Sequence, residues 1–117
     1  MPDRDEVNAL LPLQPATFHI LVALADGARH GYAIIQDVAA RTGDEIRLSP
    51  GTLYRSIQRM LEDGLVFETR ERPAADDERR RYYKLTPLGR SVAEAEAARL
   101  THLVRMARAR GLTPRKV

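Results

Sequence analysis

The stretch from Ser49 to Gly64 places the strongest constraint on this 117-residue chain, because it marks both ends of one short helix. Ser49 can cap the free N–H groups of a first helical turn. Pro50 suits the first helical position, where its missing donor costs nothing. Gly64 provides a left-handed stop. These residues predict a helix from Pro50 to Asp63.

This predicted helix has two different faces. Its apolar face is formed by residues at helical spacing, Leu53, Ile57, Met60 and Leu61. Its opposite side carries hydroxyls and guanidiniums, from Thr52, Arg55, Ser56 and Arg59. Such groups reach phosphates and base edges when a helix lies in the major groove of DNA. Taken alone, the stretch would fit a solvated amphipathic helix better, and the segments that follow it change the balance.

The composition excludes several classes of protein. A chain of 117 residues, of which 44% are hydrophobic, suits one domain with a modest core. It has no cysteine, and its three histidines are scattered, so no metal or other cofactor is expected. It offers no nucleophile–base pair and no phosphate-cradling glycine loop, so we expect no enzyme. No apolar run could span a membrane and the acidic N-terminus is unlike a signal peptide, so a cytoplasmic protein without a membrane partner is expected.

Charge is distributed unevenly along the chain. Residues 1–46 contain three arginines and seven acids, a balance of −4, whereas residues 47–117 contain sixteen basic and nine acidic residues, a balance of +7. The basic half begins where the capped helix begins. This asymmetry indicates a polyanionic partner.

The order of the remaining elements indicates the fold. Helices are predicted over residues 15–25 and 32–41, ahead of a link at 44–48 that can pair as a short strand, and strands over 65–71 and 81–85 form a hairpin. Thr86 and Pro87 begin a last helix that runs to about Arg110. Residues 1–12, at the other end of the chain, are interpreted as an extension ordered against a partner subunit.

Three helices followed by a hairpin is the order of a winged helix-turn-helix, in which the third helix reads DNA and the hairpin is the wing. The fold class is therefore mainly α with a small β-hairpin (α+β). Residues 1–86 are expected to form the DNA-binding domain, and residues 87–117 the dimerisation helix with a basic tail.

The sequence resembles the PadR family of bacterial transcriptional regulators. Its motifs include His30-Gly31-Tyr32 and Ser49-Pro50-Gly51-Thr52, within matching segments at residues 18–27, 30–34, 48–54, 61–66 and 80–89. The resemblance covers residues 13–90 and is closest to the short branch with a single C-terminal helix. It implies a homodimeric transcriptional repressor that binds double-stranded DNA. A small-molecule effector of unknown identity would release it. The chain lacks tryptophan, so a flat aromatic drug is not supported as that effector.

The candidate DNA contacts follow from the resemblance and from the helix faces. They are His30, Ser49, Pro50, Gly51, Thr52, Tyr54, Arg55, Arg59, Arg79, Arg80 and Arg81. For Tyr54, packing alone is an equal alternative, and His30 can equally be a turn residue without a role. Tyr32 is interpreted as a core residue. The basic residues after position 104 are interpreted as a solvated face.

Two groups of acidic residues lie in the basic half of the chain, at positions 62 and 63 and at the tip of the hairpin. Residues 74–78, at the hairpin tip, depart from the family by including Asp76, Asp77 and Glu78, which phosphate would repel. The wing contacts are therefore assigned to the three arginines that follow the tip. The acids at positions 62 and 63 are expected to pair with Arg59 or with these wing arginines.

The last predicted helix is longer than a three-helix core needs. Its apolar residues and one residue of the first helix are the candidate dimerisation residues, Phe18, Leu88, Val92, Ala95, Leu100, Leu103, Val104 and Ala107. A homodimer would bury them and would require a near-palindromic operator. The alternative for this helix is that it folds back on its own core. The alternative for the function is a winged-helix module that binds another protein.

Overall fold

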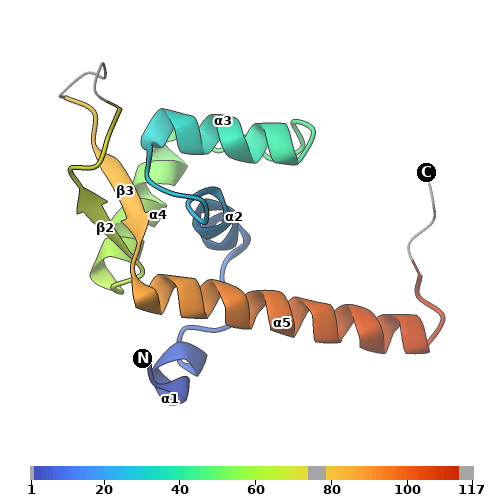
Figure 1. The fold of residues 1–117 in the computed structure, drawn as a ribbon. Helices are drawn as coiled ribbons and strands as arrows, with labels where there is room; N and C mark the ends of the chain where they lie inside the picture. The colour runs from blue at the N-terminus through green and yellow to red at the C-terminus, as the bar shows by residue number, and fades with distance from the viewer. Residues whose placement is uncertain (1, 74–78, 114–117) are drawn as a thin grey trace.

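The computed structural model describes residues 2–73 and 79–113 and is mostly helical, with a small three-stranded antiparallel sheet (Figure 1). Its elements follow in the order α1 (Arg4–Asn8), α2 (Pro15–Ala23), β1 (Arg29–His30), α3 (Gly31–Arg41), α4 (Pro50–Glu62), β2 (Val66–Thr69), β3 (Tyr82–Leu85) and α5 (Pro87–Ala109). This order confirms the winged helix-turn-helix, with α3 and α4 as the helix-turn-helix pair.

The helix boundaries confirm the local signals in the sequence. The hydroxyl of Ser49 accepts the N–H of Thr52 at 3.1 Å. The hydroxyl of Thr86 accepts the N–H of Gly89 at 2.9 Å. At Gly64, the residue after the α4 cap, φ is +74°, a conformation that costs glycine little.

The sheet differs from the predicted hairpin by one strand. The hairpin of β2 and β3 is present, with Val66 opposite Leu85. The third strand is β1, which pairs antiparallel with β3 and places His30 opposite Tyr82. The strand expected over residues 44–48 is wrong, because Asp44 adopts φ +67° and turns the chain between α3 and α4.

One core lies between the three helices of the winged domain, the sheet and the first half of α5. Its fully buried side chains come from the helices and from Leu65, just ahead of β2: Ile20, Leu21, Leu24, Ile34, Val38, Leu53, Met60, Leu65 and Val92. The sheet adds Val66, Tyr83 and Leu85, which are also buried. Because α4 contributes Leu53, Ile57 and Met60, its inner face is fixed and its outer face has a defined direction.

The junction between α4, β2 and α5 is unusually close. The hydroxyl of Thr86 donates to the carbonyl of Gly64, and the N–H of Thr86 donates to the carbonyl of Leu65 at 3.1 Å. At Gly89, a Cβ atom would lie 1.9 Å from that Leu65 carbonyl oxygen. Only glycine lets the start of α5 approach the strand this closely.

The N-terminal extension, which was expected to be ordered against a partner subunit, packs against its own chain. Helix α1 packs on α5, and Val7 is buried there. Just before α2 begins, the backbone N–H of Leu13 donates a hydrogen bond to the carboxylate of Glu96 at 3.2 Å.

Glu96 is only 2% exposed, an unusual burial for a carboxylate. Its hydrogen bonds from the Arg99 guanidinium hold the pKa of Glu96 below its usual value, against the opposing effect of burial. This carboxylate fastens the N-terminal arm, residues 2–14, to α5.

Candidate nucleic-acid interface

The outward face of α4 is the centre of the candidate site. Its exposed side chains include Tyr54 and Arg55, and Thr52 and Ser56 are half-buried beside them. The cap at Ser49 and the proline at position 50 hold the start of this face rigid, since they define the first turn.

The acids of α4 lie at its C-terminal end. Arg59 reaches Asp63 with an Nε–Oδ2 distance of 3.6 Å, and Gln58 donates to Glu62 at 3.3 Å. The pairing of Arg59 with one of these acids is thereby confirmed. Arg55 lies one turn earlier, away from these acids, so the cationic part of the face is the N-terminal half of the helix.

One flank of α4 borders a groove that we call the wing groove. It is lined by His30, Gly31, Tyr32, Tyr54, Arg79, Arg80, Arg81 and Tyr83. The groove therefore brings together residues far apart in sequence, and three arginines line one wall of it. The acidic residues 76–78 lie outside the described residues.

His30 has a structural role that sequence reasoning did not find. Its Nδ1 accepts the N–H of Ala33 at 3.1 Å and so caps α3, while its ring lies edge-on to Tyr82 with the centroids 5.4 Å apart. Its Nε2 lies 3.3 Å from a guanidinium nitrogen of Arg80.

Two tyrosines lie at the groove surface. Tyr32 is 62% exposed, so its interpretation as a core residue is wrong: it stands at the first turn of α3, on the side away from Ile34. Tyr54 is 52% exposed, so about half of its surface is open to solvent at the groove. Its hydroxyl rests against Gly31, where an added Cβ atom would lie 2.5 Å from the oxygen.

The wing carries two ion pairs between its two sides, and one of them involves Arg81, which lines this groove. Arg81 lies 3.8 Å from Glu68, and Lys84 lies 2.7 Å from Glu71. Because the side chains of Arg81 and Glu68 are both more than half exposed, their pair is weak and can exchange for a phosphate. Burial, with Glu68 nearby, raises the pKa of Tyr83, so its hydroxyl remains protonated.

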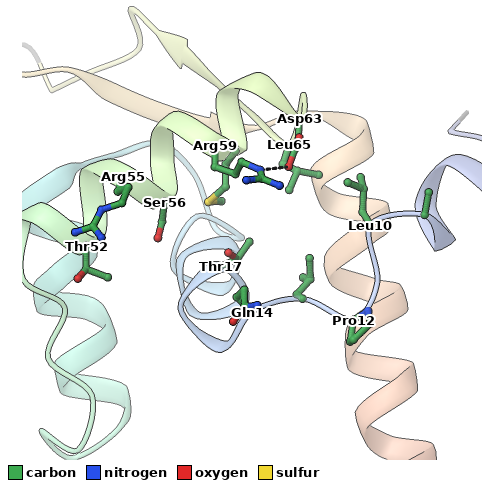
Figure 2. Close-up of a pocket in the computed structure, with 13 residues that line it drawn as sticks. Leu10, Pro12, Gln14, Thr17, Thr52, Arg55, Ser56, Arg59, Asp63 and Leu65 are labelled. Carbon is green, nitrogen blue, oxygen red and sulfur yellow. Dashed lines mark ion pairs between the residues drawn. The ribbon is translucent and has the colours of Figure 1, made fainter.

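The other flank of α4 borders a second groove, which we call the arm groove (Figure 2). Its lining comes from the N-terminal arm, from the start of α2 and from α4, and includes Leu10, Pro12, Gln14, Thr17, Thr52, Arg55, Ser56, Arg59 and Asp63. Sequence reasoning did not anticipate this groove, since the arm that forms one wall is placed by contacts with α5.

The candidate dimerisation residues divide into two groups. Leu88 and Ala95 pack against the core of their own chain, and Val92 is completely buried in it, so the assignment of Val92 to a dimer contact is wrong. The folding-back alternative is correct for this half of α5. Phe18 is half-buried on α2.

The second half of α5 extends beyond the rest of the molecule (Figure 1). Its large apolar side chains are exposed: Leu100 37%, Leu103 44%, Val104 45% and Met106 47%. Ala107 is half-buried on the same helix. The basic residues Arg115 and Lys116 lie outside the described residues.

The described residues hold neither a metal centre nor a membrane span. Between residues 2–73 and 79–113, no group of three histidine or acidic side chains could hold a metal ion. Among the helices of that same part, none is long and apolar enough to cross a membrane.

Comparison with known proteins matches this geometry. The model of the "Transcriptional regulator PadR-like family" matches residues 20–95. The transcriptional regulator Rv3488 of Mycobacterium tuberculosis is 38% identical over 87 residues, which are 74% of this chain and 77% of that protein. A 37.1 kDa protein in transposon TN4556 of Streptomyces fradiae is 40% identical over 84 residues, and the match covers 72% of this chain but only 22% of that protein.

Solved structures share the fold. A PadR family transcription regulator from Clostridium difficile R20291 has a TM-score of 0.70 at 23% identity, covering 82% of this chain and 97% of the other. Bacillus subtilis PadR, solved in complex with operator DNA, has a TM-score of 0.60 at 19% identity, covering 72% of this chain and 47% of the other.

Proposed function

The chain belongs to the PadR-like family of transcriptional regulators, which are not enzymes, and from this premise we propose that it is a dimeric, sequence-specific DNA-binding repressor. Residues 1–86 carry the DNA contacts. Residues 87–117 carry dimerisation, and the first half of α5 also completes the core. A small-molecule effector of unidentified chemistry releases the protein from its operator.

The start of α4 carries this proposal. Thr52 and Arg55 stand on the outer face of a capped helix whose inner face is buried, so their direction is fixed before DNA arrives. Residues near the start of a recognition helix meet base edges in docked helix-turn-helix proteins. The wing groove beside them supplies guanidiniums, imidazole and tyrosine hydroxyls for phosphates.

The exposed half of α5 supports the dimer. Four large apolar side chains are exposed in one short segment, and together they form a patch rather than isolated apolar surface residues. A two-fold partner would cover this patch. Such a dimer would present two recognition helices about 34 Å apart, one turn of DNA, to a near-palindromic operator.

A protein-binding module is a weaker candidate. Its contact helix would show acids or aliphatic side chains on the outer face, whereas the start of α4 shows Thr52, Tyr54 and Arg55. A mobility-shift assay on operator DNA, selected from random duplexes and titrated with salt, tests the proposal. An absence of any shift at low salt would exclude it.

We expect Arg55→Ala and Thr52→Ala to weaken operator binding by about 1–3 kcal/mol each, more than they weaken binding to random DNA. The reason is that each change removes a contact with a base edge, which is made only on the operator, as well as any attraction to DNA of arbitrary sequence. Dissociation constants on operator and random duplexes measure the ratio. Arg108→Ala is the matched control for charge, because Arg108 is exposed on α5. If the α4 variants keep the parent's ratio, this face does not read bases.

We expect replacement of Arg79, Arg80 and Arg81 by alanine to lower the slope of log K against log salt, by about 0.9 for each phosphate that is no longer neutralised. The sequence preference should remain, since phosphates carry no base identity. Replacement of Arg105, Arg108 and Arg110 removes three charges from the end of α5 as a control. Equal slopes for the wing variant and the parent would show that the wing does not touch DNA.

A further inference from the structure

The arm groove is a second hollow along α4, on the flank opposite the wing groove. Their volumes are similar, about 520 Å³ for the arm groove and 430 Å³ for the wing groove. Figure 2 shows Thr52 and Ser56 extending from α4 toward the side where Gln14, at the end of the arm, and Thr17 of α2 lie. The recognition helix therefore runs as a ridge between two grooves.

The dimensions of DNA explain what such a ridge needs. A helix with its side chains is about 10–12 Å across, and the major groove is about 12 Å wide, so a docked helix fills it. The two phosphodiester backbones that wall the major groove must then pass along both flanks of the helix. A protein that contacts one backbone in the wing groove meets the other on the arm side.

We propose that the arm groove holds the backbone of the second DNA strand, an inference that rests on the proposed function. Gln14 at the cap of α2, Thr17 in α2 and Ser56 in α4 would donate to phosphate oxygens through an amide and two hydroxyls. The start of the groove shares Thr52 and Arg55 with the base-reading face, so the two surfaces are continuous.

Charge limits where the backbone runs. The acid that lines the groove is Asp63, and Arg59 lies 3.6 Å from it at the C-terminal end of α4. The other polar lining groups are neutral donors or the guanidinium of Arg55. The phosphates therefore lie along the first two turns of α4, between Thr17 and Ser56, and stop before Asp63.

The N-terminal arm completes this surface. Leu10 and Pro12 form one wall, and the buried carboxylate of Glu96 holds the arm in place through the Leu13 amide. The groove thus exists because α5 fixes the chain ahead of α2, and α5 in this way positions one wall of the DNA-binding surface.

Adding charge to the groove tests the inference. Gln14→Lys places a cation at an exposed position where a phosphate is expected, so the salt slope of binding to random DNA should steepen by about 0.9. Gln14→Glu should weaken binding at low salt several-fold, although a negative charge at the start of α2 favours the helix. Unfolding of α2 therefore could not account for the weakening by Gln14→Glu.

Thr101→Lys and Thr101→Glu add the same charges at an exposed position on the second half of α5 and serve as controls. The inference is overturned if the Gln14 variants show the same salt slope and DNA affinity as the Thr101 variants. That result would mean that the groove holds no DNA backbone, and that it is empty or binds a small organic anion instead. That outcome leaves the proposed function intact, because the parent still binds DNA. A parent that binds no DNA at low salt overturns both.

Phosphate-ethylation interference on the selected operator gives a second readout. The parent should show sensitive phosphates on both strands that flank each major-groove site. The double variant Gln14→Ala, Thr17→Ala should lose one of the two sets and keep the set on the wing side. Retention of both sets in the double variant would contradict the assignment.

Discussion

The double substitution Leu100→Glu, Leu103→Glu is expected to convert the protein into a monomer that keeps its helical content and loses tight operator binding. Both leucines lie on the exposed half of α5, at 37% and 44% exposure, beyond the part of the helix that packs on its own core. Two carboxylates in a dimer contact would be buried without partners, which costs several kcal/mol. Neither leucine belongs to the core cluster of the single chain, so the fold is expected to form without them.

The loss of affinity should be large because the two half-sites are bound together. Linking two binding units raises overall affinity by about 10²–10⁴ over one unit, and a monomer forfeits that gain. Analytical ultracentrifugation at micromolar concentration measures the assembly, circular dichroism the helices, and mobility shift the operator affinity.

The matched control adds two acids to the same segment, outside the apolar set. Thr101→Glu with His102→Glu alters exposed polar residues and should leave both assembly and affinity close to the parent's. A parent that sediments as a monomer would refute the arrangement. So would a Leu100, Leu103 variant that remains dimeric.

The substitution Gly89→Ala is expected to destabilise the fold by about 3 kcal/mol, a large part of the roughly 5–15 kcal/mol that holds a small domain together. The new methyl group would lie 1.9 Å from the carbonyl oxygen of Leu65. That carbonyl is backbone and accepts the N–H of Thr86, so it cannot move aside as a flexible side chain would. The start of α5 must shift instead, which separates Val92 from the core.

Gly51→Ala is the matched control, because Gly51 also lies in the first turn of a capped helix. The nearest heavy atom to its added Cβ would be an Arg55 guanidinium nitrogen at 3.9 Å, an ordinary contact. This variant should be as stable as the parent or slightly more stable, since alanine favours helix over glycine by about 1 kcal/mol. Urea unfolding at a fixed protein concentration compares the two. Equal midpoints for Gly89→Ala and the parent would show that the junction can relax.

The recognition surface is determined largely by residues that are close to one another in the sequence. Ser49, Pro50 and Gly64 define α4 by contacts within a few residues, and the spacing of Leu53, Ile57 and Met60 defines its buried side. The direction of Thr52 and Arg55 then follows. The hairpin and the start of α5 were predictable for the same reason, because turns and caps act over short distances.

Other features depend on which segments meet in space. The pairing of Arg29–His30 with β3 joins positions about fifty residues apart, and a two-residue strand has no pattern that could announce it. Tyr32 has the residue type of a core side chain but faces outward, since α3 turns Ile34 and Val38 to the core instead.

Helix α5 shows the division most clearly. Its apolar spacing, with Thr86 and Gly111 at its ends, determined that the helix exists and where it begins and stops. Spacing along the helix is the same for Val92 and Leu103, so it could not say which of them the core covers. Tertiary packing decided that: α2, α1 and the sheet contact only part of the helix, bury Val92 and Glu96, and leave Leu103 exposed.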